Sequence, residues 1–242
     1  MSVFHFQRFS VRQSRAAMKV CTDATLFGAM APVSGGERVL DIGTGTGLLA
    51  LMAAQLGAAS VTAVELDRDA FEEARTNFRA SPWADRLHAV HGDIRDHAPE
   101  EGRRFDLVIS NPPFFQAHSP SPDVRRHLAR HTDQLSWSEL LHCADRLAAK
   151  NGSLYLLLPV MAVRQVRKEA EALGWFLSRR VNLKGYERNT AKVAALWFSR
   201  TEIEYQEETL IIYRSGRVYS RESECYLSPF LLRFAKPPIG LR

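Results

Sequence analysis

The sequence contains few cysteines and no segment that could anchor it in a membrane. Its three cysteines, Cys21, Cys143 and Cys225, are far apart and form no CxxC pair. Three widely spaced cysteines give neither a disulfide framework nor a zinc motif, so we expect free thiols in a reducing compartment. No apolar run approaches the roughly 20 residues of a transmembrane helix, and the first ten residues lack the apolar core of a secretory signal. These absences predict a cytoplasmic protein without membrane attachment.

Acidic residues are missing from the first 20 positions, although four cations are present there. A second basic stretch covers residues 164–200, where nine Lys and Arg residues stand against three Glu residues. Residues 65–73, by contrast, contain five acidic residues. Segregated charge of this kind is typical of a face that binds a polyanion. The alternative is a set of solvated surface charges that never gather in space.

The middle of the chain alternates strand-like and helix-like segments. Strands are predicted at 38–42, 61–64, 87–91, 105–109 and 154–158, and helices at 48–56, 69–79, 136–149 and 161–173. Ser136 and Glu139 form a capping-box pattern for the third helix, and Asn151-Gly152 would end it. Strand-like stretches at 176–183 and 193–198 have little helix between them, which indicates an antiparallel hairpin. This alternation predicts an α/β protein with a doubly wound parallel sheet covered by helices on both faces.

A glycine-rich turn follows the first predicted strand. Gly43, Gly45 and Gly47 stand at every second position, which permits a tight turn and close approach of a ligand to the backbone. The dinucleotide pattern GxGxxG would require glycine where the chain has Leu48. Asp41 would repel a pyrophosphate but suits a ligand with a cationic group, such as an ammonium. A purely structural glycine turn is the alternative.

Acidic residues follow the next two strands. Glu65 ends the second strand, where a carboxylate can accept hydrogen bonds from the two hydroxyls of a ribose. Asp93 follows the third strand, where it suits a hydrogen bond from an adenine amine. Each acid alone is more often a helix cap or a turn residue. Ligands of doubly wound sheets bind beyond the carboxyl ends of the strands, so we expect both acids to face the crevice of the glycine turn.

The segment Asn111-Pro112-Pro113-Phe114 follows the fourth predicted strand. The side-chain oxygen of Asn111 and the carbonyl of Pro112 are two acceptors that suit a planar NH₂ group. Phe114 offers a ring on which a flat substrate can stack. Alone, the tetrapeptide could be an ordinary proline-rich turn. At the carboxyl end of a strand beside the glycine turn, it predicts a clamp for an amino group.

Together these motifs resemble those of S-adenosylmethionine-dependent methyltransferases with a Rossmann-like class I fold. The NPPF segment narrows the resemblance to enzymes that methylate exocyclic or amide nitrogens. Residues 4–9 (Phe-His-Phe-Gln-Arg-Phe) and 17–23 (Ala-Met-Lys-Val-Cys-Thr-Asp) are similar to the start of the bacterial family that methylates the adenine beside the anticodon of valine tRNA. That family usually has glycine at the position of Cys21. The C-terminal Ile211-Ile212-Tyr213 resembles the family's ending more loosely.

The resemblance implies a single methyltransferase domain over residues 1–242, with a basic N-terminal extension at about 1–22 and a hairpin-like C-terminal extension at about 203–235. It implies a mostly parallel seven-stranded sheet with an antiparallel C-terminal strand. The cofactor would be S-adenosylmethionine, with Lys19 and Thr22 adding to the acids and glycines that contact it. The substrate would be tRNA, at Arg8, Arg125, Arg126, Arg130, His131, Lys184, Arg188 and Lys192. The histidines near the long loop 115–135 have no metal-ligand spacing, so no metal is expected.

Other functions remain open at this stage. A protein-glutamine N5 methyltransferase that acts on a release factor would use the same clamp, although no helical substrate domain precedes the motif. A non-catalytic RNA-binding module on the same scaffold is a second alternative. A nucleotide-binding oxidoreductase is a third, and the glycine spacing disfavours it.

Overall fold

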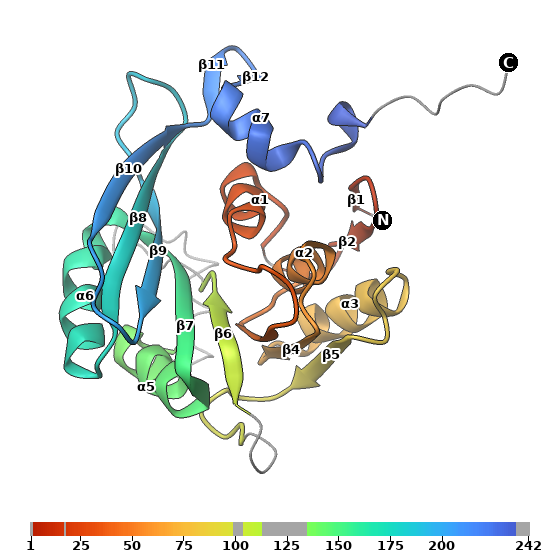
Figure 1. Ribbon diagram of the computed structural model, residues 1–242. Coiled ribbons are helices and arrows are strands. Elements are labelled where there is room, and N and C mark those ends of the chain that lie inside the picture. Colours follow the sequence, from red (N-terminus) through yellow and green to blue (C-terminus); the bar gives the residue numbers. More distant parts are fainter. Residues whose placement is uncertain (1, 17, 99–103, 113–134, 236–242) are drawn as a thin grey trace, which may run out of the picture.

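The computed structural model describes residues 2–16, 18–98, 104–112 and 135–235, and an eight-stranded sheet forms their centre. Its strands are β3 (Arg38–Ile42), β4 (Ser60–Glu65), β5 (Leu87–His91), β6 (Phe105–Ser110), β7 (Ala148–Pro159), β8 (Phe176–Lys184), β9 (Val193–Ser199) and β10 (Gln206–Ile211). They are ordered β10-β8-β9-β7-β6-β3-β4-β5 (Figure 1). Within this sheet β9 is antiparallel to β7 and β8, and the other neighbouring pairs are parallel.

The predicted α/β architecture with a mostly parallel sheet is confirmed, including the antiparallel strand near the C-terminal end. The strand β10 was not predicted, and it adds an eighth strand parallel to β8. Its sequence, Gln-Glu-Glu-Thr-Leu-Ile, is polar at four of six positions, and its first four residues are exposed. An edge strand covered by charge lacks the apolar pattern from which strands are predicted.

Helices cover both faces of the sheet. On one face lie α1 (Thr22–Ala29), α2 (Leu48–Leu56) and α3 (Arg68–Arg79), and on the other lie α5 (Trp137–Leu147) and α6 (Val163–Ala172), as Figure 1 shows. Side chains alternate along each strand, so one strand feeds both cores. In β6, Leu107 and Ile109 join the α2 side, whereas Val108 joins the α5 side.

The helix α5 is shorter than the sequence indicates. Its capping box at Ser136 and Glu139 is confirmed, but the helix ends at Leu147 and β7 begins at Ala148. A side chain at Gly152 would lie 3.0 Å from the carbonyl oxygen of Phe105, in the neighbouring strand. Glycine is therefore required here for a close approach between strands rather than for a helix end, which explains the wrong boundary.

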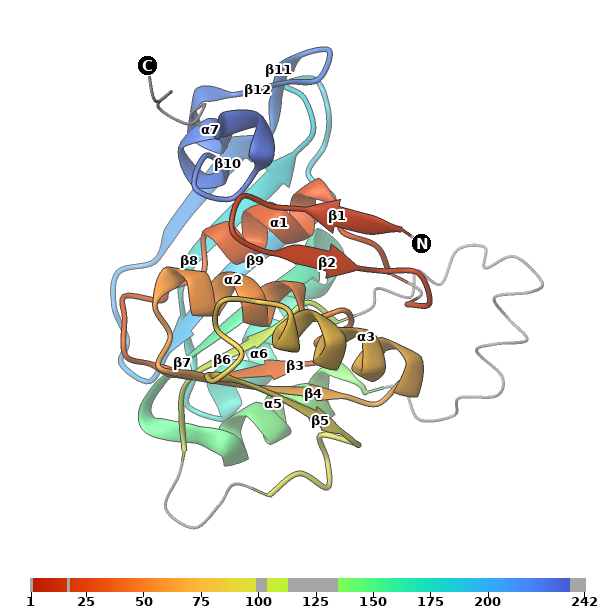
Figure 2. The ribbon, with the colours of Figure 1, turned by 90° about the vertical axis from the view of Figure 1, so that its right-hand side faces the viewer.

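Short elements at both ends of the chain pack against the α1–α2 side. The strands β1 (Val3–His5) and β2 (Ser10–Arg12) pair as an N-terminal hairpin. The C-terminal elements are β11 (Tyr213–Ser215), β12 (Val218–Tyr219), α7 (Arg221–Leu227) and η2 (Leu232–Phe234). The short helix η1 (Val160–Ala162) belongs instead to the middle of the chain, where it follows β7. Figure 2 shows α7 above α1 and the N-terminal hairpin beside it. The two ends meet where Gln7 Nε2 donates to the carbonyls of Ser228 and Leu231, at 2.7 and 2.9 Å.

The three cysteines are free thiols, as expected, and Cys21 and Cys225 are exposed. Among the described segments, we find no helix that has both the length and the apolar composition of a membrane span.

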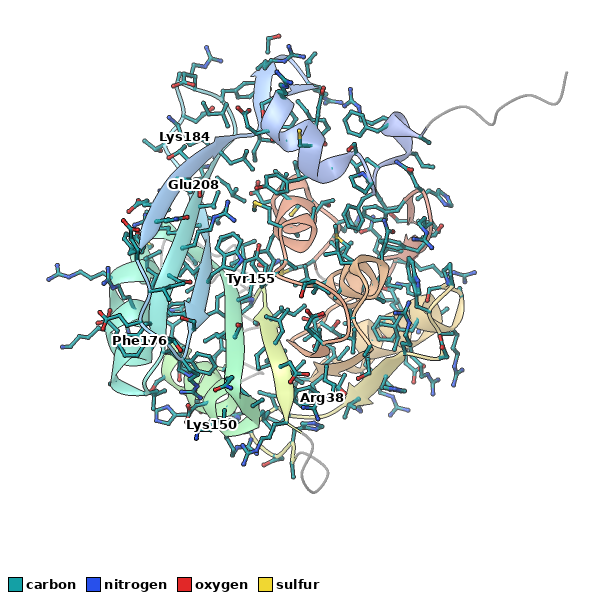
Figure 3. The ribbon with its side chains drawn as sticks, viewed as in Figure 1. Arg38, Lys150, Tyr155, Phe176, Lys184 and Glu208 are labelled. Carbon is teal, nitrogen blue, oxygen red and sulfur yellow. The ribbon has the colours of Figure 1, made fainter. Side chains whose placement is uncertain are left out.

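The carboxyl ends of the parallel strands form one edge of the sheet. In Figure 3, Arg38 at the start of β3 and Lys150 near the start of β7 lie at the lower end, and Lys184 at the end of β8 lies at the upper end. This upper edge, here called the carboxyl edge, also carries the glycine turn after β3 and Asn111 after β6. The glycine turn and Asn111 therefore lie on the same edge of the sheet.

Candidate active site

The glycine turn connects β3 to α2 in a left-handed backbone conformation. Gly43, Gly45 and Gly47 have φ angles of 69°, 58° and 86°, which other L-residues rarely adopt. A side chain at Gly43 or Gly45 would meet nothing within 4 Å, whereas one at Gly47 would lie 2.4 Å from the ring of Phe78. The first two glycines thus border open space that a ligand could use. The third is required for packing of the turn against α3.

Asp41, in β3 just before this turn, is fully buried. One of its carboxylate oxygens accepts a hydrogen bond from the Thr44 hydroxyl at 2.6 Å. The other oxygen, Oδ1, is buried and has no hydrogen-bond partner among the described residues. Burial raises the pKa of Asp41 to about 7. The Ala50 N–H, at the start of α2, lies near the carboxylate and lowers its pKa, but Oδ1 has no hydrogen bond of good geometry and keeps capacity for a donor that is not part of the protein.

Glu65, at the end of β4, fastens the glycine turn to the neighbouring strand. One of its oxygens accepts from the Gly45 N–H at 2.7 Å, and the other accepts from the Asp67 N–H at 2.9 Å. Burial raises the pKa of the Glu65 carboxyl despite these hydrogen bonds. Because each carboxylate oxygen has two lone pairs, acceptor capacity remains at the side of the turn.

Asp93 has a partner that the sequence analysis missed. The Arg95 guanidinium donates to both carboxylate oxygens of Asp93, at 2.5 to 3.0 Å, and also to Glu139 at 3.2 Å. These hydrogen bonds hold the pKa of Asp93 below its usual range. The carboxylate is therefore ionised and fixed in orientation, and it is joined through Arg95 to the capping box of α5.

Asn111 directly follows β6, the strand beside β3. The Ser110 hydroxyl donates to the Ile42 carbonyl at 2.8 Å, which fixes the two strand ends in register. The side-chain oxygen of Asn111 is buried and finds no hydrogen-bond partner within the described parts of the chain. Neighbouring strands lie about 4.8 Å apart, so Asn111 borders the glycine turn. Pro112 is buried, and Pro113 and Phe114 lie outside the described residues.

Two polar residues of α3 hold the N-terminal segment against the glycine turn. Asn77 Nδ2 donates to the carbonyls of Thr46 and Arg12 at 2.9 and 3.0 Å, and its oxygen accepts from the Arg12 N–H at 2.9 Å. Glu73 accepts from three successive N–H groups, those of residues 14–16. Both side chains are almost completely buried. These contacts cannot be predicted from local sequence patterns, because their partners are 31 to 65 residues away.

The two N-terminal cofactor candidates have different surroundings. The hydroxyl of Thr22, at the start of α1, shares a 2.9 Å hydrogen bond with the Tyr213 hydroxyl of the C-terminal hairpin. Lys19 is exposed in the preceding segment, and it makes no hydrogen bond to the other described residues. The structure therefore links Thr22 to the C-terminal elements but does not bring Lys19 to Asp41 or Glu65.

The substrate candidates fall into three groups. Lys184, Arg188 and Lys192 lie at the carboxyl edge, in and around the segment between β8 and β9. Arg8 stacks on Trp83, 5.1 Å from the ring centre, between the end of α3 and the start of β5 and hence at the opposite edge. The third group, Arg125, Arg126, Arg130 and His131, lies outside the described residues.

Part of the basic stretch 164–200 is neutralised by acids elsewhere in the chain. Arg179 pairs with Glu208 at 3.0 Å, and Arg180 with Glu207 at 3.4 Å. Both acids belong to the unpredicted strand β10. Arg200 pairs in the same way with Asp145 of α5. Among residues 2–16, 18–98, 104–112 and 135–235, no cluster of His, Cys, Asp or Glu could hold a metal ion.

Comparison with known proteins identifies the family. Residues 19–159 match the family model of the methyltransferase small domain. A protein of Tolumonas auensis named tRNA1(Val) (adenine(37)-N6)-methyltransferase is 42% identical over 96% of this chain and 98% of its own length. This chain belongs to that methyltransferase family. The resemblance inferred from its motifs is thereby confirmed, and so is its nature as an enzyme of methyl transfer.

Solved structures support the same fold. A protein of Agrobacterium tumefaciens described as an O-methyltransferase aligns with a TM-score of 0.64 at 18% identity, over 84% of this chain and 94% of its own. A class I S-adenosylmethionine-dependent methyltransferase of Listeria monocytogenes aligns with a TM-score of 0.57 at 16% identity, over 82% of this chain and 67% of its own. The class I fold is therefore confirmed, and membership of the family implies S-adenosylmethionine as the methyl donor.

Proposed function

We propose that this protein transfers a methyl group from S-adenosylmethionine to the exocyclic N6 of an adenine in tRNA. By the name of its relatives, this adenine is residue 37, next to the anticodon, of tRNA(Val). One observation carries the proposal: the buried Asn111 oxygen has no partner among the described residues, and it borders the glycine turn. An amino group on the substrate would supply the missing donor at the place where the cofactor's methyl group arrives.

The residues around the turn fit the cofactor. Asp41 Oδ1 is a buried acceptor suited to the ammonium of the methionyl part, and Glu65 is suited to the two ribose hydroxyls. The open space beside Gly43 and Gly45 allows close approach of a ligand to the backbone. Asp93 is kept ionised by Arg95, so it is suited to accept from the adenine amine. When bound, S-adenosylmethionine supplies an electrophilic methyl group on a sulfonium.

The clamp residues address the weakness of the nucleophile. The lone pair of an adenine amine is delocalised into the ring, which makes the nitrogen a poor nucleophile. The two N–H groups of this amine would donate hydrogen bonds to the Asn111 oxygen and the Pro112 carbonyl. These hydrogen bonds would favour a pyramidal nitrogen and stabilise the positive charge that develops on it. The methylated nitrogen is acidic and can lose its proton afterwards, so no general base is required. Phe114 completes the clamp on the strength of the sequence, as a stacking surface worth on the order of 1–3 kcal/mol.

The cations of the carboxyl edge are proposed to contact the tRNA backbone; Arg188 and Lys192 are exposed, and Lys184 is half-buried. Lys184, Arg188 and Lys192 lie on the same edge as Asn111, and the loop residues Arg125, Arg126, Arg130 and His131 join them on the strength of the sequence. Arg8 lies at the opposite edge and would reach only an outer phosphate. Because the target adenine is part of a folded RNA, it must leave its stack to enter the pocket.

The terminal segments belong, in this proposal, to the same single domain. Phe6 of the N-terminal segment and Leu227 of α7 pack in one core cluster with α2, which supports one folding unit over the described residues. Thr22 would act through Tyr213, by holding the start of α1 beside the site. Lys19 would contact the cofactor only once the cofactor is bound.

A test of methyl acceptors distinguishes this function from its main alternative. The protein would be incubated with radiolabelled S-adenosylmethionine and either unmodified tRNA(Val) or a purified release factor. We expect label in the tRNA and none in the release factor. Label in the release factor would replace the proposal by glutamine methylation, and absence of label from both would favour a non-catalytic RNA-binding role.

A further inference from the structure

We propose that the C-terminal segment 213–221 is a second contact surface for the RNA backbone, separate from the clamp. This segment, here called the arginine hairpin, contains β11, β12 and the first residue of α7. The three arginines that would contact phosphates are Arg214, Arg217 and Arg221. The inference rests on the proposed function, because it assumes that the polyanion is the tRNA substrate.

The arginine hairpin has no acidic residue of its own, and the first acids after it are Glu222 and Glu224, in the first turn of α7. Residues 211–221 contain three arginines and no acidic residue. All three arginines are exposed, and within the described segments none lies within 4.0 Å of a carboxylate. Arg179 and Arg180, in contrast, are paired with Glu208 and Glu207. Exposed guanidinium groups without an internal partner are suited to phosphate oxygens, which they can bind through two parallel hydrogen bonds.

The arginine hairpin is fastened to the carboxyl edge by the main chain. The N–H groups of Ile212 and Tyr213 donate to the carbonyls of Lys184 and Gly185, at 2.7 and 2.9 Å. The Tyr186 hydroxyl donates to the Gly216 carbonyl. These contacts join the hairpin to the segment between β8 and β9, so its arginines extend the basic group that contains Lys184, Arg188 and Lys192.

Aromatic packing gives the hairpin a fixed shape. The ring of Tyr213 stacks on that of Tyr219 with centres 5.1 Å apart, and the centre of the Tyr186 ring lies 5.5 Å from that of Tyr213. Arg214 Nε donates to the Tyr219 carbonyl at 3.1 Å, which orients its guanidinium. A surface that is ordered before binding loses little side-chain entropy when the ligand arrives.

The location of the hairpin suits an RNA whose base enters the clamp. The sheet order β8-β9-β7-β6 places the end of β8 three strands from Asn111, and with a spacing of about 4.8 Å per strand this is roughly 14 Å. A tRNA carries a phosphate at each nucleotide, so backbone on either side of the extruded adenine lies within that range.

The test compares tRNA binding by two double variants of equal charge. In Arg217→Ala/Arg221→Ala the hairpin loses two cations, and Arg214 is left in place because it braces the turn. The control is Arg79→Ala/Lys150→Ala, which removes two exposed cations from the opposite edge of the sheet (Figure 3 labels Lys150). The dissociation constant of labelled, unmodified tRNA(Val) would be measured at several salt concentrations by fluorescence anisotropy.

We expect the hairpin variant to bind tRNA roughly tenfold more weakly. The salt slope, which is the steepness with which the logarithm of the binding constant falls with the logarithm of the salt concentration, should decrease by about 1.4 to 1.8, or 0.7 to 0.9 for each lost phosphate contact. The control should keep the wild-type slope. The conservative variant Arg217→Lys/Arg221→Lys should restore most of the slope, which separates loss of charge from a folding defect. Cofactor affinity, measured by calorimetry, should stay unchanged in all variants.

Two results would overturn the inference. Equal weakening in both double variants would mean that only net charge matters, and an unchanged slope in the hairpin variant would mean that RNA does not touch it. Either result leaves the proposed function intact if the wild-type protein methylates tRNA. Conversely, a wild-type protein that binds tRNA through the hairpin but transfers no methyl group would refute the proposed function alone.

Discussion

The two halves of the carboxyl edge are built on opposite principles. Around β3 and β4 the carboxylates are buried or half-buried and are held in place by hydrogen bonds, Asp41 by the Thr44 hydroxyl and Glu65 by main-chain N–H groups, and burial raises the pKa of both. Around the ends of β8 and β9, Arg188 and Lys192 are exposed and Lys184 is half-buried, and the arginine hairpin contains no acidic residue. A small ligand requires a few acceptors fixed in advance, whereas a large polyanion requires accessible charge. In the proposed function, one edge of the sheet would serve both.

Substitution of Asn111 should have the largest effect, because Asn111 lies at the border between the two halves. Asn111→Ala removes the buried acceptor, and we expect transfer to fall by about 10²–10³-fold or more while cofactor affinity stays nearly unchanged. Single-turnover transfer and calorimetry measure the two quantities. Asn151→Ala, an exposed asparagine at the opposite edge, is the control and should behave as wild type. Normal turnover in Asn111→Ala would remove the clamp from this account.

Asp41 tests the buried half. Asp41→Asn keeps the volume but removes the charge, so we expect cofactor affinity to fall by roughly 10- to 100-fold, as for loss of a charge-assisted hydrogen bond. Glu65→Ala should also weaken binding. Calorimetry measures both, and unchanged affinity in both variants would contradict the assigned cofactor site.

The raised pKa of Asp41 also predicts the pH dependence. In the folded protein the Asp41 carboxyl keeps its proton up to a pH of about 7. Only the ionised carboxylate attracts the ammonium of the cofactor, so the affinity of the wild type for the cofactor should rise as pH increases through 7. The same group binds more protons folded than unfolded between about pH 4 and 7, so the ligand-free protein should lose stability over this range. Asp41→Asn should show neither change. Equal pH profiles of variant and wild type would contradict the assignment.

Asn77 tests whether the N-terminal segment supports the buried half. Asn77→Ala leaves the carbonyls of Arg12 and Thr46 and the Arg12 N–H without their partner, which should lower the free energy of unfolding by about 1–3 kcal/mol. Chemical denaturation measures this loss. Thr76→Ala, on the exposed side of the same helix, is the control. If both variants lose equally little, the segment is not fastened through Asn77.

Arg95 should give the smallest effect. Arg95→Ala frees the Asp93 carboxylate, whose pKa then rises toward its usual range, and we expect a loss of cofactor affinity of only a few-fold near neutral pH. Below the loss of affinity that Asp41 causes near pH 7, a second loss should appear in the wild type when Asp93 is protonated at its lowered pKa, and in the variant this second loss should begin at higher pH. Arg167→Ala, which breaks an exposed pair on α6, is the control. An identical acid limb in variant and wild type would mean that Arg95 does not orient Asp93 for the ligand.

The same contrast explains which features could be predicted from the sequence. The glycine turn and the strand ends depend on residues adjacent in the chain, so Gly43, Gly45, Glu65 and Asn111 were located correctly along one edge. The partners of Asp93 and Asn77 were missed, because they depend on side-chain orientation or on contacts distant in sequence. The neutralisation of Arg179 and Arg180 was missed as well, because the acids lie on an edge strand whose charged sequence does not resemble a strand.

The central claim is that the protein methylates the amine of an adenine beside the anticodon, at the site bordered by the glycine turn and Asn111. The most direct measurement is mass spectrometry of nuclease digests of unmodified tRNA(Val), after incubation with the protein and S-adenosylmethionine carrying a deuterated methyl group. The account predicts a single labelled nucleoside, N6-methyladenosine at position 37, that is lost in Asn111→Ala. Label on another atom or nucleotide, or a labelled product that persists in Asn111→Ala, would contradict it.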